Sequence, residues 1–219
     1  MNEGIMALLV QWTLLICAWM GLFDSAIQKS GFSRAKLLAT LTAFLCCSFA
    51  NWELYFMPLA VNVSGVILPF LLAGWMYVRL TVSNKEYILA AGILCACVIL
   101  FMRKLLFWDP ILLVVEEILL VPLLCIILIN LIARNFMHQL FVLLLALPLS
   151  DLLYVGSNVA LIPQVESSVA GSLEAQDIFW VSIGVWVIAK AVWEASKVTG
   201  KITMKPLQTL RKSKTKNRI

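Results

Sequence analysis

Seven long apolar stretches constrain this chain more than any other feature of its sequence. A helix needs about 20 mostly apolar residues to cross the hydrocarbon core of a bilayer. The stretches are rich in Leu and Ala and do not alternate between apolar and polar residues, which predicts helices rather than strands. They cover residues 4–23, 37–53, 61–78, 87–102, 111–133, 136–160 and 178–193. We therefore expect an all-α fold, a polytopic transmembrane helical bundle of about seven spans.

The composition of the chain also indicates a lipid environment. Of its 219 residues, 62% are hydrophobic and 13% are charged, whereas a soluble domain is roughly 45–50% apolar and about 25% charged. There is too little polar surface to cover a soluble core of this size. A soluble globular domain, a disordered chain, a coiled coil and a secreted disulfide scaffold are excluded, and an integral, multi-pass membrane protein is predicted.

The distribution of basic residues predicts the orientation of the helices. With seven spans, 15 of the 17 Lys and Arg residues lie on one side of the membrane, and Arg103 and Lys104 lie on the other. Because basic loops stay in the cytoplasm, we expect the N-terminus outside and the C-terminus in the cytoplasm. The acidic loop 163–177 then lies outside, and we expect a mobile linker there. The first span is expected to be retained, since Glu3 and no base precedes it, unlike a secretory signal.

The last 25 residues have a different character from the rest of the chain. We expect residues 1–194 to form the helical bundle and residues 195–219 to form a basic cytoplasmic tail. Such a tail fixes the topology and is attracted to anionic lipid by about 1 kcal/mol per base. It contains no aromatic residue on which a nucleobase could stack, so no nucleic-acid partner is expected. The predicted lipid-surface contacts are Lys197, Lys201, Lys205, Arg211, Lys212, Lys214, Lys216 and Arg218.

The sequence predicts neither a catalytic site nor a metal or cofactor site. All six cysteines lie within predicted spans without a Cys-x-x-Cys spacing, and His138 is the sole histidine. We therefore interpret the cysteines as small hydrophobic residues rather than metal ligands. The motifs of serine and aspartate hydrolases and of phosphate-binding loops are missing, so no enzyme is expected. Lys190, with Glu194 four residues later, is interpreted as an anchor at the cytoplasmic boundary.

Charged residues inside spans are costly and are therefore the candidates for function. Glu116 and Glu117 lie about 9–10 Å below the outer end of the fifth span, and adjacent helical positions point about 100° apart. Only one of the two carboxylates can then face fully inward. One stripe of the expected helix carries Asp109, Glu116, Asn130 and Arg134, which favours Glu116 as the inward-facing residue.

Asp151 is the corresponding carboxylate of the sixth span, about 14 Å below its outer end. A very short turn joins the fifth and sixth spans, so the two helices are expected to pack as antiparallel neighbours. Their carboxylates then reach a similar depth, close to the two outer bases. One interpretation is a structural pairing that stabilises helix packing, and the other is an outward-facing site for a cation, proton or small polar solute. The candidate intramembrane polar or ion-binding residues are Glu116, Glu117, Asp151, Asn158, Arg103 and Lys104.

Several features of the chain resemble a known family. The opening Met1-Asn2-Glu3-Gly4, the Trp-containing first span, the basic first loop and the length near two hundred residues are similar to the YphA-type small membrane proteins of spore-forming Firmicutes. The stretch from Val61 to Pro69 adds an Asn-x-x-Gly-x-x-x-Pro element found in several bacterial membrane families. The resemblance implies a bacterial inner-membrane protein without an assigned activity, and it carries no functional residue across.

Two functions remain open on these grounds. The first is a structural or interaction protein of the bacterial cell envelope, whose partners are the lipid bilayer and a further membrane protein. The alternative is a small-solute or ion- or proton-coupled transporter that uses the intramembrane carboxylates.

Overall fold

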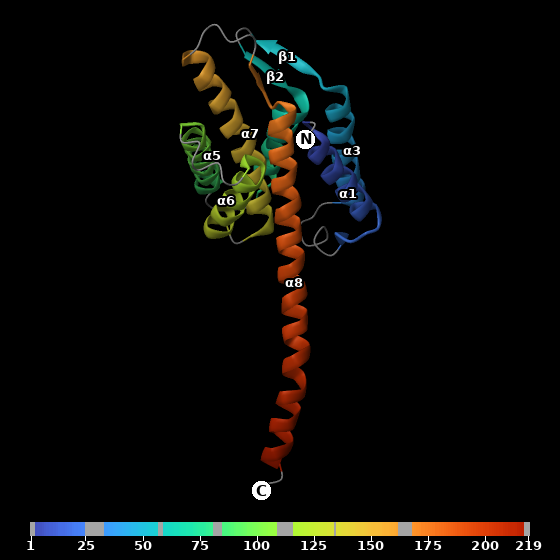
Figure 1. Cartoon of the computed structure of the whole chain (residues 1–219). Helices are drawn as coiled ribbons and strands as arrows, with labels where there is room; N and C mark the ends of the chain where they lie inside the picture. Colours follow the sequence, from blue (N-terminus) through green and yellow to red (C-terminus); the bar gives the residue numbers. More distant parts are fainter. Residues whose placement is uncertain are drawn as a thin grey trace. The chain divides into compact units, whose positions relative to one another are not determined.

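The chain is mostly helical and divides into two compact units, Met1–Gly184 and Val185–Ile219, which are described separately (Figure 1). The computed structural model describes residues 3–24, 33–56, 59–80, 85–108, 116–133, 135–161 and 168–216. The helices are α1 (Ile5–Trp19), α3 (Arg34–Ala50), the π-helix η1 (Val63–Ile67), α4 (Leu68–Arg79), α5 (Lys85–Trp108), α6 (Glu117–Ile132), α7 (Phe136–Leu161) and α8 (Leu173–Lys216). The strands are β1 (Glu53–Phe56), β2 (Leu59–Asn62) and β3 (Ser168–Ala170).

Three of the described helices are long and apolar enough to cross a membrane by length and composition. They are α5, the part of α7 from Phe136 to Asn158, and the part of α8 from Leu173 to Glu194. The apolar helices α1, η1 with α4, and α6 are shorter. The predicted helical character is therefore confirmed, while the number of crossings and the boundary at residue 194 stay predictions.

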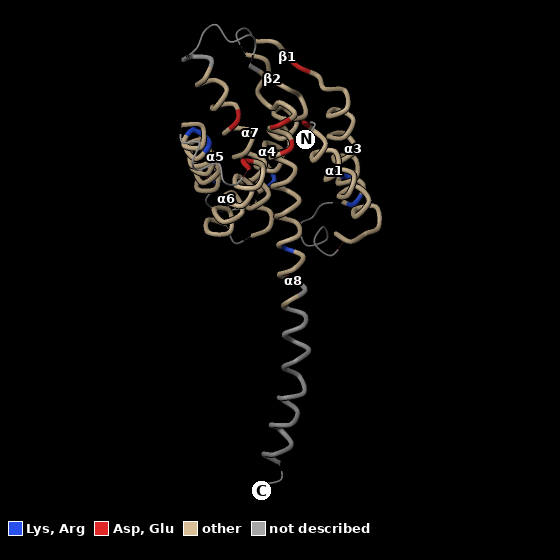
Figure 2. Tube along the Cα trace, viewed as in Figure 1, with Lys and Arg blue, Asp and Glu red and all other residues tan. Residues whose placement is uncertain are grey.

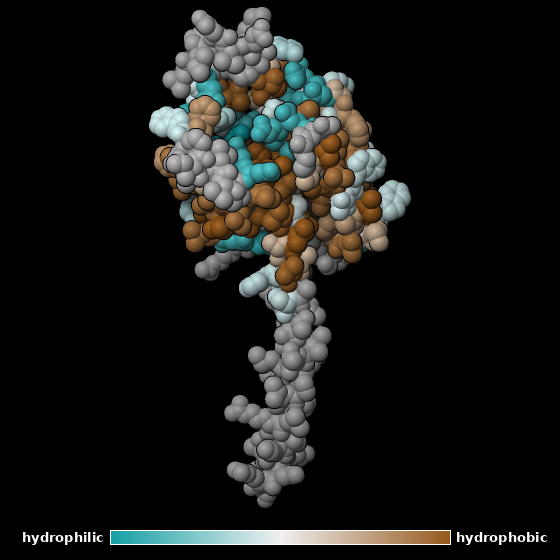
Figure 3. Space-filling view, viewed as in Figure 1, coloured by the Kyte–Doolittle hydropathy of each residue, from teal (hydrophilic) through white to brown (hydrophobic). Residues whose placement is uncertain are grey.

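The first unit exposes large apolar side chains along its helices, as expected of a protein surrounded by lipid. Leu131, Leu123 and Phe101 are among the most exposed. Figure 3 shows broad brown, hydrophobic areas on the visible face, with the teal, hydrophilic residues gathered toward one end of this unit. Figure 2 shows acidic residues near the start of α1 at that end. The bases at the start of α3 lie at the other end of α1, where Arg34 Nε donates to the carbonyl of Ala18 over 3.2 Å.

Several helix ends differ from the predicted span limits for local reasons. Helix α3 begins where the Ser33 hydroxyl accepts a hydrogen bond from the Lys36 amide, a typical N-cap. It ends at Ala50 rather than at Glu53 because Asn51 adopts a left-handed conformation, with φ 46° and ψ 47°, which stops the helical hydrogen bonds. Helix ends are therefore set by capping side chains as well as by hydropathy.

A small three-stranded sheet is the feature that the expected all-α fold lacked. Strand β1 pairs with β2 in antiparallel fashion, with Glu53 opposite Asn62, and β2 pairs with β3 in parallel, with Leu59 opposite Ser168. The predicted helix over 61–78 is therefore wrong at its start, where Val61 belongs to β2. The Asn62 side chain accepts hydrogen bonds from the amides of Ser64 and Gly65 and so caps η1, which passes directly into α4.

Two glycines allow η1 to touch the turn that joins β3 to α8. A Cβ atom added to Gly65 would lie 2.6 Å from Cα of Gly171, closer than real Cβ contacts allow. Gly171 itself has a φ of +75°, which other residues rarely adopt. The close backbone contact therefore requires glycine at both positions.

Helices α1 and α8 begin at the same end of the first unit. The Asp177 carboxylate accepts hydrogen bonds from the amides of Gly4 over 2.8 Å and Ala7 over 2.7 Å, at the start of α1. Further along α1, Cγ1 of Val10 lies 3.2 Å from the position that a Cβ atom on Gly184 of α8 would take. The two helices therefore run side by side in the same direction. The expectation of a linker is wrong for residues 168–177, where β3 and the first turn of α8 lie, and residues 163–167 lie outside the described part of the chain.

Candidate functional site

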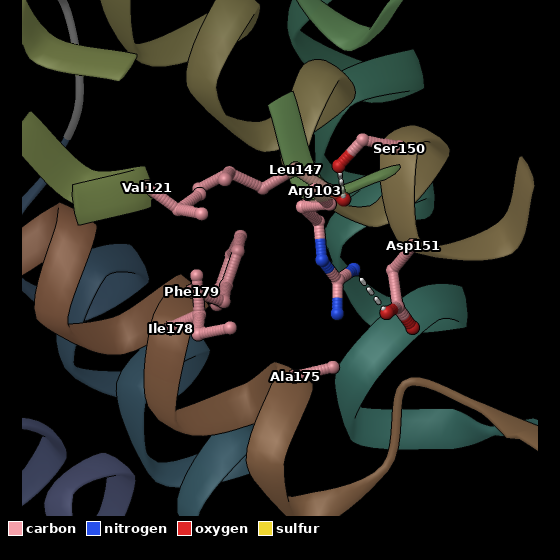
Figure 4. A pocket seen from close by; sticks show the side chains of 8 residues that line it. All are labelled: Arg103, Val121, Leu147, Ser150, Asp151, Ala175, Ile178 and Phe179. Carbon is pink, nitrogen blue, oxygen red and sulfur yellow. Dashed lines mark hydrogen bonds and ion pairs between the residues drawn. The ribbon is translucent and has the colours of Figure 1, made fainter. Parts of the chain in front are cut away.

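A buried ion-pair centre joins helices α5, α6 and α7. Arg103 of α5 is 9% exposed and forms ion pairs with carboxylates on both neighbouring helices. Its Nε donates to Oε1 of Glu117 over 2.5 Å. Its Nη1 donates to Oδ1 of Asp151 over 2.7 Å, the bond drawn as a dashed line in Figure 4. One guanidinium thus neutralises part of the charge of two carboxylates, which leaves the three side chains with a net charge of −1 when all are ionised.

The ring of Tyr154 completes the surroundings of the guanidinium. Cζ of Arg103 lies 4.4 Å from the ring centroid of Tyr154, a distance at which a cation is attracted to the ring face. Tyr154 follows Asp151 by three positions on α7, so both side chains project from one face of the helix. The structure therefore places the side chains of Asp151 and Tyr154 against the same guanidinium.

Glu117, rather than Glu116, is the carboxylate of α6 that reaches the centre. Glu116 is exposed and precedes the helix, with φ −57° and ψ 141°. The helical spacing that assigned Glu116 to the stripe does not apply to a residue with this extended backbone. The interpretation of Glu116 as the inward-facing residue is therefore wrong.

Lys104 and Asn158 lie outside this centre. Lys104 follows Arg103 on α5, points about 100° away around the helix, and forms no ion pair with a described residue. Asn158 is half-buried near the end of α7, and no described residue shares a hydrogen bond with its side chain. Seven of the predicted tail bases lie in α8, where their side chains are not described, and Arg218 lies outside the described residues.

Asp151 also connects the ion-pair centre to the start of α8. Its second oxygen, Oδ2, accepts a hydrogen bond from the Gly171 amide over 2.6 Å. From there, Nε2 of Gln176 donates to the Gly171 carbonyl over 3.1 Å, and the Ser64 hydroxyl lies 2.8 Å from Oε1 of Gln176. The β3–α8 turn is thus held by side chains of α7, η1 and α8 itself.

The same network extends to α1 and α3 through uncharged side chains. The Ser48 hydroxyl lies 3.2 Å from Oε1 of Gln176, and Nε2 of Gln11 donates to that hydroxyl over 3.0 Å. Asn62 joins it through Oδ1, which accepts from Nε2 of Gln176 over 3.3 Å, and its Nδ2 donates to Oδ1 of Asn51 over 2.8 Å. Buried amides and hydroxyls that satisfy one another are a common way to hold transmembrane helices together.

The sequence predicted none of the roles of Gln176, Asp177 and Gly171. Asp177 and Gly171 belonged to the expected linker, and Gln176 is an uncharged residue between them. One signal was present: Ser172 followed by Glu174 before an apolar run is typical of a helix start. The Ser172 hydroxyl indeed accepts a hydrogen bond from the Ala175 amide over 3.3 Å. With that cap, the predicted start of the last helix shifts from residue 178 to Leu173, and Gln176 and Asp177 then belong to the helix.

A cavity beside Arg103 and Asp151 shows how little free space the centre has. Its volume is about 10 Å³, which is the space that one water molecule needs. It is lined by Arg103, Val121, Leu147, Ser150, Asp151, Ala175, Ile178 and Phe179. Among the described residues, no cluster of His, Cys, Asp and Glu could hold a metal ion. The arrangement can pair charges and hold the three helices together.

The sequence was compared with known protein families, curated proteins and solved structures. A family model described as YphA-like integral membrane protein matches residues 3–216. No curated protein and no solved structure matches significantly. The expected resemblance to this family is therefore confirmed, over nearly the whole chain.

Proposed function

The chain belongs to the family of YphA-like integral membrane proteins, and from this premise we propose that it is a structural or interaction protein of the bacterial cell envelope, without enzymatic activity. The observation that carries the proposal is the ion-pair centre, in which Arg103 and Asp151 are buried. Arg103 is bound on two sides by carboxylates, and the adjoining cavity holds one water molecule at most. Ligand sites for small molecules measure about 300–1,000 Å³, so the centre is better suited to fastening helices than to moving a solute.

The energetic cost of such a centre supports a structural role. Removing one partner of a buried ion pair typically costs about 3–5 kcal/mol, because the other charge stays buried without compensation. Arg103 has two such partners on two helices. Its loss would therefore affect the packing of α5, α6 and α7 together.

We also propose seven crossings of the bacterial inner membrane, with the N-terminus outside and the C-terminus in the cytoplasm. Asp177 caps the start of α1 from the start of α8, so an even number of crossings separates these two helix starts. Helices α1, α3, α4, α5, α6 and α7 supply six. The short helices α1, α4 and α6 require local thinning of the bilayer, which costs little per ångström. Cysteine-accessibility labelling at the two chain ends tests the proposal, and both ends on one side would refute it.

The basic tail is proposed to contact anionic lipid on the cytoplasmic face. Its eight bases without an intervening acid, from Lys197 to Arg218, support this contact. In nanodiscs of anionic phosphatidylglycerol, we expect trypsin to cleave the tail more slowly than in nanodiscs of zwitterionic phosphatidylcholine. The difference should shrink at high salt, since surface attraction is screened. Equal cleavage rates in both lipids would contradict the proposal.

The alternative of a proton- or cation-coupled carrier draws on one specific observation. Glu117 is 28% exposed and uses only Oε1 for Arg103, within a centre of net negative charge. An incoming proton or small cation could reach the other oxygen from the surface. One experiment distinguishes the structural function from the carrier function.

That experiment measures folded yield and proton or Na⁺ uptake for four proteins, the parent and three variants. Glu117→Gln and Asp151→Asn remove the charges of the centre, and Glu116→Gln is the matched control on the exposed neighbour. A structural protein should give no proton or Na⁺ uptake into vesicles above protein-free vesicles, while the first two variants lose folded yield and the control does not. Uptake by the parent that Glu117→Gln abolishes without loss of folding would refute the structural proposal and establish a carrier.

A further inference from the structure

Strand β1 is an edge strand, and one of its two sides has no partner among the described residues. The strand order is β1-β2-β3, so β2 pairs with one side of β1 only. The Val63 amide donates to the Trp52 carbonyl over 2.9 Å, which makes these two opposite residues a hydrogen-bonded pair. Such pairs alternate along an antiparallel ladder. The main-chain groups of Glu53 and Tyr55 therefore point away from β2, toward the open edge.

This open edge is a template for a further strand. No described residue accepts from the amides of Glu53 and Tyr55 on this side or donates to their carbonyls. Many natural edge strands are protected from pairing by Lys, by Pro or by a bulge. Strand β1 reads Glu-Leu-Tyr-Phe, and its register with β2 runs without interruption from Glu53 to Phe56. None of these three protections is present within the strand.

The side chains of this segment are exposed as well as its main chain. Trp52, Leu54 and Phe56 alternate onto one face, and their exposed fractions are 62%, 45% and 63%. Glu53 and Tyr55 lie on the other face, where the phenol donates to the carboxylate over 3.0 Å. A strand that pairs with this edge therefore meets an apolar row on one face and a polar row on the other.

A second copy of the same strand satisfies this edge completely. When a two-fold axis passes through Leu54, Glu53 of each copy lies opposite Tyr55 of the other copy. Every main-chain N–H and C=O group that these two residues present to the open edge then has a partner. An axis at Glu53 or at Tyr55 would instead pair that residue with itself and place the other one opposite a position outside β1. Only the axis at Leu54 uses the whole edge.

The side chains agree with the same axis. Trp52 then lies opposite Phe56 of the second copy, on either side of the paired Leu54 side chains, and aromatic cross-strand pairs stabilise antiparallel strands. On the other face, each Glu53 carboxylate lies opposite a Tyr55 phenol, which can donate to it. Like charges are therefore not directly opposed, and the strand is complementary to itself in charge as well as in apolar surface.

We propose that the chain forms a two-fold symmetric dimer in which the β1 strands of two copies pair in antiparallel fashion about Leu54. Its interface is isologous, with the same patch on both copies. The dimer goes beyond the function proposed above, because a structural protein and a carrier could both assemble through this strand. Its failure would therefore leave the test of transport unaffected.

Cysteine cross-linking of the full chain in liposomes tests the register. In Leu54→Cys, the two new side chains lie at a directly opposed, non-hydrogen-bonded position, where Cα atoms are about 4.5 Å apart and a disulfide is able to form. Phe56→Cys is the matched control, because its Cα atoms would lie about 13 Å apart along the strands, beyond the reach of a disulfide.

The oxidant in this experiment is copper phenanthroline, at a low ratio of protein to lipid. We expect Leu54→Cys to give several-fold more covalent dimer than Phe56→Cys, and more than the parent with its natural cysteines. Equal yields from the two variants would mean random collision or a different contact, and they would overturn the proposal.

Two substitutions at Tyr55 in the Leu54→Cys protein test whether main-chain bonds hold the dimer. Tyr55→Pro removes an amide N–H that points to the open edge, so the bonds from β1 to β2 are kept, and proline is tolerated on such edges. We expect it to abolish most of the cross-link. Tyr55→Phe keeps the amide and should retain the cross-link. A cross-link that survives Tyr55→Pro would show that the strands do not pair.

The parent chain gives an independent measurement that needs no substitution in the strand. With one dye at the C-terminus, in liposomes dilute enough to hold at most one particle each, a dimer bleaches in two steps. Two-step traces should dominate the record. Single-step traces in nearly all liposomes would mean that lipid headgroups or water cover the β1 edge, and they would overturn the proposal.

Discussion

The contact between Gly65 and Gly171 leads to the sharpest prediction from this fold. In Gly65→Ala, the new Cβ would lie 2.6 Å from Cα and 2.9 Å from the carbonyl carbon of Gly171. Both atoms belong to backbone, which yields far less readily than the end of a flexible side chain. The substitution must therefore push η1 and the β3–α8 turn apart.

The magnitude of the loss follows from what this displacement breaks. Overpacking a close contact costs about 1–3 kcal/mol. Gly171 also donates its amide to Asp151 and accepts from Gln176, and each buried hydrogen bond contributes about 1 kcal/mol. We expect Gly65→Ala to lower the free energy of unfolding by roughly 3–5 kcal/mol, which is a large share of the 5–15 kcal/mol of a typical protein.

The assay is unfolding in mixed micelles with increasing dodecyl sulfate, followed by circular dichroism. Gly74→Ala is the matched control, since Gly74 lies within α4 and a Cβ there meets nothing within 4 Å. Alanine favours a helix over glycine by about 0.5–1 kcal/mol, so the control should be neutral or stabilising. If Gly65→Ala unfolds at the same midpoint as the parent, the two backbones are not in contact and the reasoning about the turn is refuted.

Three further predictions concern single side chains. Arg103→Met should lower the free energy of unfolding by about 3–5 kcal/mol, because two carboxylates lose their buried partner, whereas Lys104→Met next to it should change it by less than about 1 kcal/mol in the same micelle titration. Asp177→Asn weakens the bonds to the first amides of α1 and should cost about 1–2 kcal/mol, seen as faster amide exchange confined to that helix start; uniform exchange would contradict it. The Tyr55 hydroxyl donates to the Glu53 carboxylate, and this hydrogen bond, together with the negative charge of Glu53, raises the pKa of the phenol, so the phenol stays protonated to higher pH. Glu53→Gln should shift this ultraviolet titration to lower pH, and an unchanged titration would show that the two side chains do not interact.

The start of α8 helps to determine how the other elements pack. Within seven residues, Gly171, Gln176 and Asp177 contact α7, η1, α3 and α1. Displacement of this single turn would disturb four elements at once. Substitutions there should therefore destabilise the protein more than substitutions at equally buried apolar positions of one helix pair.

The ion-pair centre was only partly predictable from the chain. Arg103 and Asp151 were recognisable because a charge inside an apolar run is costly and needs a partner. The choice between Glu116 and Glu117 was not, because it depends on where α6 begins. A residue that precedes the first turn does not follow helical spacing, so its side chain does not share a face with the helix. Hydropathy does not specify the start of a helix to one residue.

The apolar runs by themselves determined that this chain is a helical membrane protein, because hydrocarbon leaves backbone amides no partner except those of the same segment. They also determined where most helices lie along the chain. Only the tertiary structure decided the small sheet at Val61, the glycine contact at Gly65 and the capping of α1 by Asp177. Those features depend on atoms more than 100 residues apart, and the geometry that joins them does not exist until the helices have packed.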